Sequence, residues 1–459
     1  MRRYTIHLFI ALFFLLTTAS DIFSKAPEPD ESTIITSVII SGNKVTKTET
    51  VRYLSGIFAG MPFDSSAIEN AKERLKNTGL FFKVDILSLR SSDGYRVYII
   101  LTEKFYLLPY DLGGELYGYR YGKPKRWWRL RVGLEYTNFR GKAEVLRTSF
   151  SVFEWHSFGI GWYKPFLPSP WFFSFGIRAD QLPDEVFLID HSILRSSLTA
   201  GRKLPLHSRV EFSLMPMYRR RILFDTSLTA TDTVRVSEAF SMLRWNTDYR
   251  DRYFDPTRGW MLTWDFRTNA LYNGIAPAFG QFYTDFRWYN QGFLPSHRLA
   301  CRFTSVARTN DAGITHRLQL GGEGSVRGYA RSQFGRYFVA NNTMTVSMEY
   351  RFPIYQFPDM DLVLLNMISP VFSSISYRLD GALIIDHGRL STRFLDLFSP
   401  NPSHIESGTG IGVGLRAVTP TFERSVCFDL VWGTWPWSPR GSISFMKQPM
   451  WHWYLDMYF

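Results

Sequence analysis

Residues 344–352 read Met-Thr-Val-Ser-Met-Glu-Tyr-Arg-Phe, with large apolar side chains at every second position and polar or charged ones between them. A period of two is that of a β-strand with one apolar and one polar face. The same alternation returns in residues 262–267, 410–417 and 451–459. In each of these segments a charged or His side chain stands opposite bulky apolar ones. This pattern is typical of membrane-barrel strands, which turn one face to lipid and the other to the lumen.

The pattern continues from Pro109 to the end of the chain, without a persistent helical period and with Gly, Pro, Asn and Asp between the strand-like runs. A soluble β-sandwich also alternates. However, the 14 Trp, 24 Tyr and 39 Phe suit the aromatic girdles of a membrane barrel. A sheet in hydrocarbon must also be closed, because open edges leave backbone groups unsatisfied. We therefore predict a transmembrane antiparallel β-barrel of about sixteen strands over residues 110–459, with its first strand near Leu134.

The N-terminus has the layout of a secretory signal peptide. Arg2 and Arg3 precede an apolar stretch at residues 8–16, and small residues follow at 17–20. This order predicts export, with a signal peptide in residues 1–26. Ala19, Ser20 and Ala26 each fit the last residue before the cleavage site, and the sequence does not choose among them. Beyond this segment no run reaches the ~18 apolar residues that a spanning helix needs.

Residues 33–103 have a different pattern, which predicts a small α+β domain. The expected order is strand, two helices and two strands, at residues 34–40, 47–54, 62–77, 82–86 and 95–101. Ser66 and Glu69 fit a capping box at the start of the second helix. Phe82, Val84 and Ile86 form the apolar side of the strand after it.

Composition and motifs exclude several classes of function. The formal net charge is +12, but Lys and Arg are scattered, so no nucleic-acid partner is expected. Cys301 and Cys427 lie far apart and cannot form the disulfide framework of a small secreted protein. The sequence contains no Gly-x-Ser-x-Gly, His-Glu-x-x-His or Cys-x-x-Cys motif. We therefore expect no enzyme activity, no catalytic residue, no metal and no cofactor.

The most specific motif spans residues 321–329, which read Gly-Gly-Glu-Gly-Ser-Val-Arg-Gly-Tyr. It resembles the Val-Arg-Gly-(Phe/Tyr) motif of the superfamily that includes the BamA and TamA assembly proteins and the two-partner secretion transporters. In that family the motif lies on an outer loop folded back into the barrel. The resemblance implies a lumenal position for Gly324, Val326, Arg327, Gly328 and Tyr329. A glycine-rich run can also hold phosphate, but this spacing does not fit the dinucleotide fingerprint.

The same resemblance suggests partners for Arg327. Residues 381–388 resemble the family's Phe-x-Asp-x-Gly strand, except that Ile384 stands where an aromatic residue is usual. Glu349 lies on the polar side of a matching strand. A guanidinium in a confined lumen needs carboxylate partners, and a bidentate pair also fixes its orientation. We therefore predict that Arg327 contacts Asp386, Glu349 or both.

Further segments extend the resemblance over the barrel. Residues 136–141 are similar to the family's first barrel hairpin, and residues 251–259 to its Asp-x-Arg-x-x-Pro-x-x-Gly turn. Residues 410–429 are similar to its penultimate strand pair, with Arg416 and Asp429 on the lumenal side. These residues could serve packing alone.

Both ends of the exported chain carry family features as well. Residues 33–103 resemble a polypeptide-transport-associated (POTRA) domain, above all in the helix-to-strand passage at residues 77–84. In the family this domain lies in the periplasm. The alternating Trp453, Leu455, Met457 and Phe459 resemble the C-terminal signal by which outer-membrane barrels are recognised for insertion.

The resemblance implies an outer-membrane protein that takes up unfolded polypeptide through its periplasmic domain and inserts or translocates it through the barrel or its seam. The expected partners are unfolded outer-membrane or secreted polypeptides, outer-membrane lipid, and accessory periplasmic proteins or lipoproteins. A two-partner secretion pore and a passive channel remain alternatives. Two-partner members usually carry two POTRA domains and a plug helix, whereas BamA carries five such domains and TamA three. One domain here favours insertion with a narrow range of clients.

Overall fold

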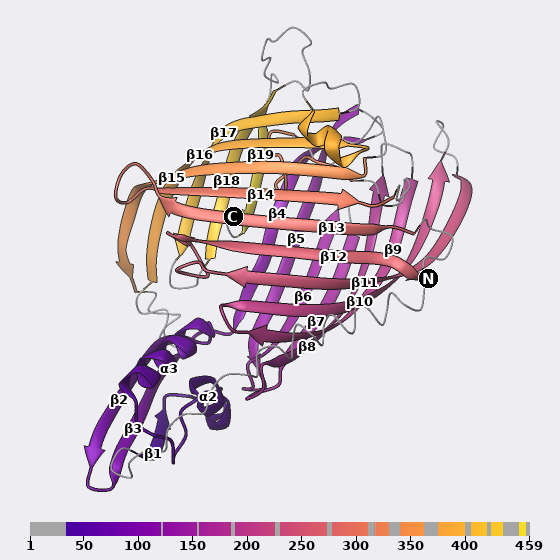
Figure 1. Cartoon of the computed structure of the whole chain (residues 1–459). Helices are drawn as coiled ribbons and strands as arrows, with labels where there is room; N and C mark the ends of the chain where they lie inside the picture. The colour runs from indigo at the N-terminus through magenta and orange to yellow at the C-terminus, as the bar shows by residue number, and fades with distance from the viewer. Residues whose placement is uncertain are drawn as a thin grey trace.

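The computed structural model describes residues 34–120, 123–153, 156–184, 189–224, 230–272, 278–310, 316, 318–329, 340–361, 375–399, 405–419, 424–434 and 449–455. The predicted signal peptide lies outside these residues, as do Met457 and Phe459. The chain forms a small N-terminal α+β domain, followed by a large β-barrel (Figure 1).

Within the described residues, sixteen antiparallel strands close into one barrel, so the predicted fold class and strand number are confirmed. They are β4 (Leu107–Arg120), β5 (Lys123–Phe139), β6 (Glu144–Phe153), β7 (His156–Pro165), β8 (Trp171–Asp184), β9 (Ile189–Leu204), β10 (Ser208–Phe224), β11 (Ala230–Asp248), β12 (Gly259–Tyr272), β13 (Gly280–Gln291), β14 (Arg298–Arg308), β15 (Asn342–Met360), β16 (Ile375–Ser391), β17 (Ile405–Thr419), β18 (Arg424–Gly433) and β19 (Met450–Leu455). A short 3-10 helix, Phe394–Phe398, lies between β16 and β17.

The first barrel strand begins earlier in the chain than the sequence pattern indicated. Leu134 lies on β5, the second barrel strand, and β4 already begins at Leu107. Two register shifts, after Pro109 and after Glu115, interrupt the alternation of β4. A bulge moves the side chains that follow it to the other face, so a search for strict alternation misses such a strand.

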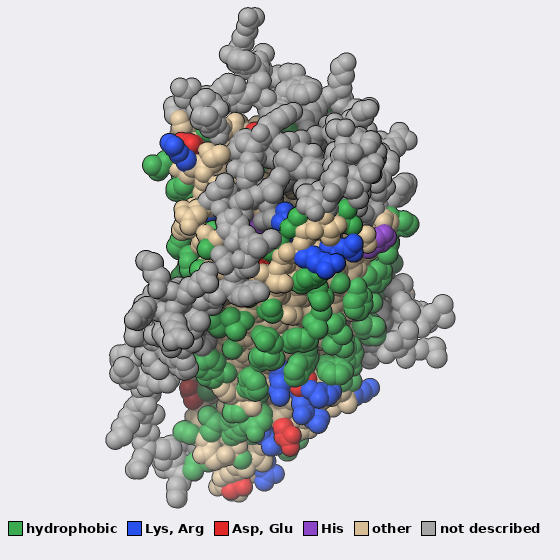
Figure 2. Space-filling model, turned by 90° about the vertical axis from the view of Figure 1, so that its right-hand side faces the viewer, with side chains coloured by type: hydrophobic (Ala, Val, Ile, Leu, Met, Phe, Trp, Pro, Cys, Tyr) green, Lys and Arg blue, Asp and Glu red, His purple; other side chains and the backbone are tan. Residues whose placement is uncertain are grey.

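The barrel wall has an apolar outer face and a polar inner face. On β16, Leu383 and Ile385 are each 50% exposed on the outside, whereas Asp386 is fully buried on the inside. The outer side chains form a hydrophobic belt with Lys and Arg along its rims (Figure 2). This is the surface that a barrel needs in a bilayer.

The N-terminal domain packs two helices on one face of a three-stranded sheet. Its elements are β1 (Ile35–Ser41), α2 (Thr48–Ser55), α3 (Ser65–Asn77), β2 (Phe81–Ser91) and β3 (Gly94–Glu103), in the expected order, with β3 at the centre of the sheet. Val51, Ala71 and Leu75 from the helices are buried against Val97 and Ile99 of β3. Among the described helices, none is long and apolar enough to span a membrane.

Two local expectations for this domain are wrong. Helix α3 is capped by Asp64, whose carboxylate accepts the N–H of Ser66 at 2.9 Å, and not by a capping box of Ser66 and Glu69. Phe82 is 47% exposed, while Phe81 is buried, because a register shift between Phe81 and Lys83 makes Phe82 the extra residue of a bulge. In both cases the actual residue lies one or two positions before the expected one, and hydrophobic periodicity does not resolve so small a difference.

The N-terminal domain docks on the turn between β5 and β6, in the segment predicted to be the first barrel hairpin. The backbone N–H of Lys47 and the hydroxyl of Thr50 both donate to the carbonyl of Gly141, at 3.0 and 2.9 Å. Asn138 donates its side-chain amide to the Thr46 hydroxyl at 2.7 Å. Gly141 has φ +69°, and a Cβ there would lie 2.3 Å from the carbonyl oxygen of Val45. The turn therefore both reverses the chain and holds the domain.

Glu103 orders the loop that makes these contacts. Its carboxylate accepts the backbone N–H groups of Lys44, Val45 and Thr46, at 3.0, 2.9 and 2.6 Å. Partial burial works to raise the pKa of Glu103, but the hydrogen bonds from Thr46 and Val45 outweigh it and hold the pKa below its ordinary value. The ionised carboxylate therefore stabilises the junction between the domain and the barrel.

We expect this contribution to depend on pH. Since the pKa of Glu103 is lowered by folding, its contribution is complete above the ordinary glutamate pKa and is lost as the pH falls through the lowered value. Glu103→Gln should speed hydrogen exchange at the Lys44 and Thr46 amides at neutral pH and abolish the acid-dependent part of their exchange. Glu69→Gln, on the exposed side of α3, is the control. Unchanged protection in Glu103→Gln would contradict this role.

Candidate functional site: an arginine held inside the barrel

A loop from the end of β14 returns into the barrel and is folded tightly at residues 318–329. Gly321 and Gly322 have φ of +118° and +88°, conformations that side chains disfavour. The N–H of Gly322 donates to the carbonyl of Tyr329 at 2.8 Å and closes the loop. Val326, Arg327 and Tyr329 are all completely buried. The motif thus lies against the inner wall.

Arg327 forms a bidentate pair with Asp386 of β16. Its Nε and Nη2 donate to the two carboxylate oxygens at 2.7 and 2.9 Å, and its backbone N–H donates to the same group at 3.1 Å. Its Nη1 donates to Glu349 of β15 and, at 3.0 Å, to Asp429 of β18. The structure therefore places both predicted partners on one guanidinium and adds a third carboxylate.

The surrounding charges complete a balanced cluster of six. Arg416 of β17 contacts Glu349 at 2.7 Å and also pairs with Asp429. Arg351 contacts the second oxygen of Glu349 at 2.8 Å. Three guanidinium groups thus face three carboxylates, and all six side chains are almost fully buried. Removing one member of such a cluster leaves a buried charge uncompensated, which is costly.

Three members of the site were not singled out from the sequence. Arg351 is the first, and the other two are on the last strand. Tyr454 donates its hydroxyl to Asp429 at 2.8 Å, and His452 donates Nε2–H to the backbone carbonyl of Arg327 at 2.6 Å. Alternation had placed all three on polar faces, so the strand parity was correct. Which residues on that face meet the loop depends on strand register, which the sequence does not reveal.

Glycines in the wall allow the loop to pack closely. A Cβ at Gly328 would lie 2.8 Å from the Cα and N of Gly433 and 2.9 Å from the Cα of Gly410. A Cβ at Gly388 would lie 2.5 Å from a methyl carbon of Val326. Tyr329 donates its hydroxyl to the carbonyl of Thr434. The loop backbone is thereby pressed onto β16, β17 and β18.

The two motif glycines should respond very differently to substitution. Gly328→Ala meets backbone atoms on two strands, and overpacking of this kind costs about 1–3 kcal/mol. Gly324→Ala is the matched control, because a Cβ there meets nothing within 4 Å and its φ is not in the left-handed region. We expect the thermal unfolding midpoint to fall in the first variant only. Equal midpoints would show that the close approach of the loop is unimportant.

The loop touches both sides of the seam where the last strand meets the first. Within the described residues β19 pairs with β4 at His452–Glu115, Trp453–Gly114 and Tyr454–Gly113. Glu323 of the loop pairs with Arg131 of β5, while Arg327 contacts β19. The loop therefore links β19 to β5 across the seam between β19 and β4.

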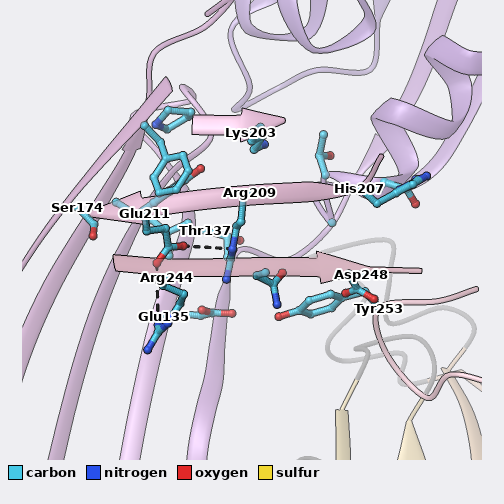
Figure 3. A pocket seen from close by; sticks show the side chains of 18 of the residues that line it. Glu135, Thr137, Ser174, Lys203, His207, Arg209, Glu211, Arg244, Asp248 and Tyr253 are labelled. Atoms are coloured by element: carbon cyan, nitrogen blue, oxygen red, sulfur yellow. Dashed lines mark ion pairs between the residues drawn. The ribbon is translucent and has the colours of Figure 1, made fainter. Parts of the chain in front are cut away.

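A large cavity lies at the end of the barrel that carries the N-terminal domain. Its volume is about 1850 Å³, and residues of α3 and of the lumenal wall line it. Figure 3 shows Arg209 and Glu211 on one strand facing Arg244 on the next. Glu211 is 3.1 Å from Arg209 and 3.9 Å from Arg244. Among the described residues, no group of three His, Cys, Asp or Glu is placed to hold a metal.

A closed sixteen-strand barrel with an apolar belt, an internal arginine loop and one small α+β domain defines a class of outer-membrane barrel proteins. The Omp85 superfamily domain matches residues 138–428, and a POTRA domain, the surface antigen variable number repeat, matches residues 33–104. The chain belongs to the Omp85 superfamily. Its β-barrel fold indicates a location in the bacterial outer membrane. Membership supports insertion or translocation of polypeptides in general.

Solved structures share the fold at low sequence identity. BamA from Haemophilus ducreyi lacking POTRA domains 1–3 has a TM-score of 0.58 at 14% identity, covering 92% of this chain and 84% of that one. CdiB from Acinetobacter baumannii has a TM-score of 0.60 at 12% identity, covering 93% and 74%. CdiB from Escherichia coli has 0.53 at 10% identity, covering 99% and 97%. No curated protein sequence matches significantly.

Proposed function

We propose that this protein inserts unfolded β-barrel polypeptides into the outer membrane through the seam between β4 and β19. The bridging loop carries this proposal, because Arg327 contacts His452 and Tyr454 of β19 while Glu323 pairs with Arg131 of β5. A strand edge that is released there presents unpaired N–H and C=O groups, which can pair with an incoming strand. Withdrawal of the loop would remove these contacts from both sides of the seam and would ease its opening.

The POTRA domain would receive the polypeptide in the periplasm. Membrane barrels have short turns on the periplasmic side and longer loops outside. At the POTRA end, β9 and β10 are joined through residues 205–207, whereas at the other end β14 stops at Arg308 and β15 begins at Asn342. This asymmetry supports a periplasmic POTRA domain. The cavity between α3 and the lumenal wall then opens toward the arriving chain.

A polypeptide secretion pore is the second candidate, favoured by the same cavity because it extends from the POTRA domain into the lumen. The buried arginine loop counts against it, since clearing the lumen would have to separate Arg327 from its three carboxylate partners. We propose no enzymatic chemistry for either mode. Accessory periplasmic proteins or lipoproteins are proposed only as helpers in client delivery.

Reconstitution into phospholipid vesicles distinguishes the two candidates. Protein oriented with the POTRA domain outward is mixed with an unfolded barrel client. If the protein inserts its client, the client will be folded in the bilayer and will keep the mobility of a folded barrel on an unheated denaturing gel. Translocation predicts protease-protected client inside the vesicle and a conductance across planar bilayers. Recovery of the client in the vesicle interior would overturn the insertion proposal.

A further inference from the structure

Strands β15 and β16 run past their neighbours at the POTRA end of the barrel. Within the described part of the chain, the pairing of β14 with β15 extends to Arg351, and the pairing of β17 with β16 extends to Arg378. Residues 353–360 and 375–380 pair with each other beyond the β14 ladder and are here named the β15–β16 ribbon; its residues 378–380 also pair with β17. Figure 1 shows these strands, in orange, projecting beyond the barrel wall. An isolated two-stranded ribbon is only marginally stable in water.

A bulge keeps the apolar side of this ribbon in line with the lipid-facing side of the barrel. The register shifts between Pro353 and Tyr355, so Ile354 is the extra residue. Tyr355 then pairs with Leu379 and Phe357 with Tyr377, which share the face of the outward-pointing Leu383. Without the shift, the outer row would continue through Gln356 instead. The outer apolar row of the wall is thereby extended by two aromatic side chains.

These aromatic side chains lie open on the ribbon. Tyr355 is 54% exposed and Phe357 is 42% exposed, and their ring centroids are 4.6 Å apart. Ile354 and Met360 are also exposed. The ribbon begins directly after Phe352, the last residue of the alternating segment 344–352 of β15. Tyrosine and phenylalanine are enriched where a membrane barrel meets the headgroup region.

The opposite face of the ribbon is polar and anchored. Arg378 donates to Asp380 at 2.8 Å and to Asp255 at 2.6 Å, and Asp255 belongs to the turn between β11 and β12. Arg298 at the start of β14 pairs with the same Asp255. This network fixes which face points away from the lumen. The ribbon therefore presents its aromatic side outward by construction.

We propose that the β15–β16 ribbon is a lipid-contact element whose aromatic face lies in the leaflet on the POTRA side of the bilayer. Addition of a client strand to the ribbon edge is the competing interpretation. Pro353 and Pro358 lack N–H groups, and prolines on an exposed strand disfavour such pairing. Continuity with the lipid-facing wall favours lipid. The ribbon would make the apolar wall taller at β15–β16 than at β14 and β17.

Nitroxide labelling of the full-length chain tests this proposal. Cys301→Ser and Cys427→Ala remove the native thiols, and Phe357→Cys provides the label site. Gln356→Cys, its neighbour on the other face, is the matched control, and Leu89→Cys on the POTRA sheet is the aqueous reference. The protein is reconstituted in phosphatidylethanolamine and phosphatidylglycerol vesicles. Collision rates are measured with oxygen, which partitions into lipid, and with a water-soluble nickel chelate.

We expect the oxygen-to-nickel ratio at position 357 to exceed that at 356 and 89 several-fold. Equal ratios at 356 and 357 would show a ribbon standing in water and would overturn the proposal. A nickel-accessible label at 357 that becomes protected only when unfolded polypeptide is added would overturn it in favour of client docking. If the label at 357 prevents barrel formation, Tyr355→Cys gives the same test from the same face. The measurement contains no client in its first arm, so its failure leaves the insertion proposal untouched.

Discussion

Arg327→Ala is expected to abolish client insertion while the barrel still assembles in the membrane. The substitution removes the bidentate partner of Asp386 and leaves three buried carboxylates with two guanidinium groups. Breaking a buried pair from one side costs roughly 3–5 kcal/mol, most of it from the charge left behind. The wall itself loses no backbone hydrogen bond, because Arg327 belongs to a loop. Loop and wall should therefore separate before the barrel unfolds.

Two readouts separate these effects. Mobility on an unheated gel reports barrel assembly, and insertion of an unfolded client into vesicles reports activity. Arg327→Lys keeps the charge but cannot form the bidentate pair, so we expect partial activity. Arg393→Ala, at an exposed position in the segment between β16 and β17, is the control for loss of one arginine. Wild-type insertion by Arg327→Ala would refute a functional role for the buried pair.

Locking the seam with a disulfide is expected to stop insertion reversibly. Gly114 on β4 and Trp453 on β19 are direct partners in the ladder, so cysteines at both positions can join the strands after Cys301 and Cys427 have been replaced. An insertion mechanism needs this edge to open, and a covalent bond prevents that. We expect client insertion to fall to background when oxidised and to recover with reductant.

The chain offers a matched control for this experiment. Cys301 on β14 is the partner of Trp288 on β13, so Trp288→Cys with Cys301 retained and Cys427→Ala forms a disulfide across a ladder far from the seam. Both control positions are on the outer face, as is Trp453. The control should insert clients whether oxidised or reduced. Full activity of the locked seam variant would remove the edge mechanism and move the secretion pore, tested by conductance, into first place.

Alternation in the sequence was sufficient to predict the barrel and the inner face of its strands. Glu349, Asp386, Arg416 and Asp429 all lie on the lumenal side and meet at the loop. Parity alone could not select them, because many other polar residues share that face. Arg327 was singled out by the family motif at residues 321–329. Register decides which residues lie opposite one another on neighbouring strands. It is set by closure of the whole barrel.

Other features depend on shifts of a single residue. The bulge that exposes Phe82 and the interrupted β4 both break the period of two that sequence reading relies on. The docking of the POTRA domain on Gly141 was also not foreseen, because it joins residues about ninety positions apart in sequence. The family resemblance identified the turn at residues 136–141, but only the three-dimensional structure shows that the POTRA domain docks on it.

The position of this docking turn constrains the order in which the protein itself matures. The core of the POTRA domain lies almost entirely within residues 34–103, so we expect the domain to fold before the barrel. The groups on which it docks, the Gly141 carbonyl and the Asn138 side-chain amide, exist in the right geometry only once β5 and β6 have paired. The domain should therefore dock only after β5 and β6 have paired, and it should move independently of the barrel before then. Pulse-labelled exchange at the Lys47 amide should show protection no earlier than in the β5–β6 ladder; earlier protection would exclude this order.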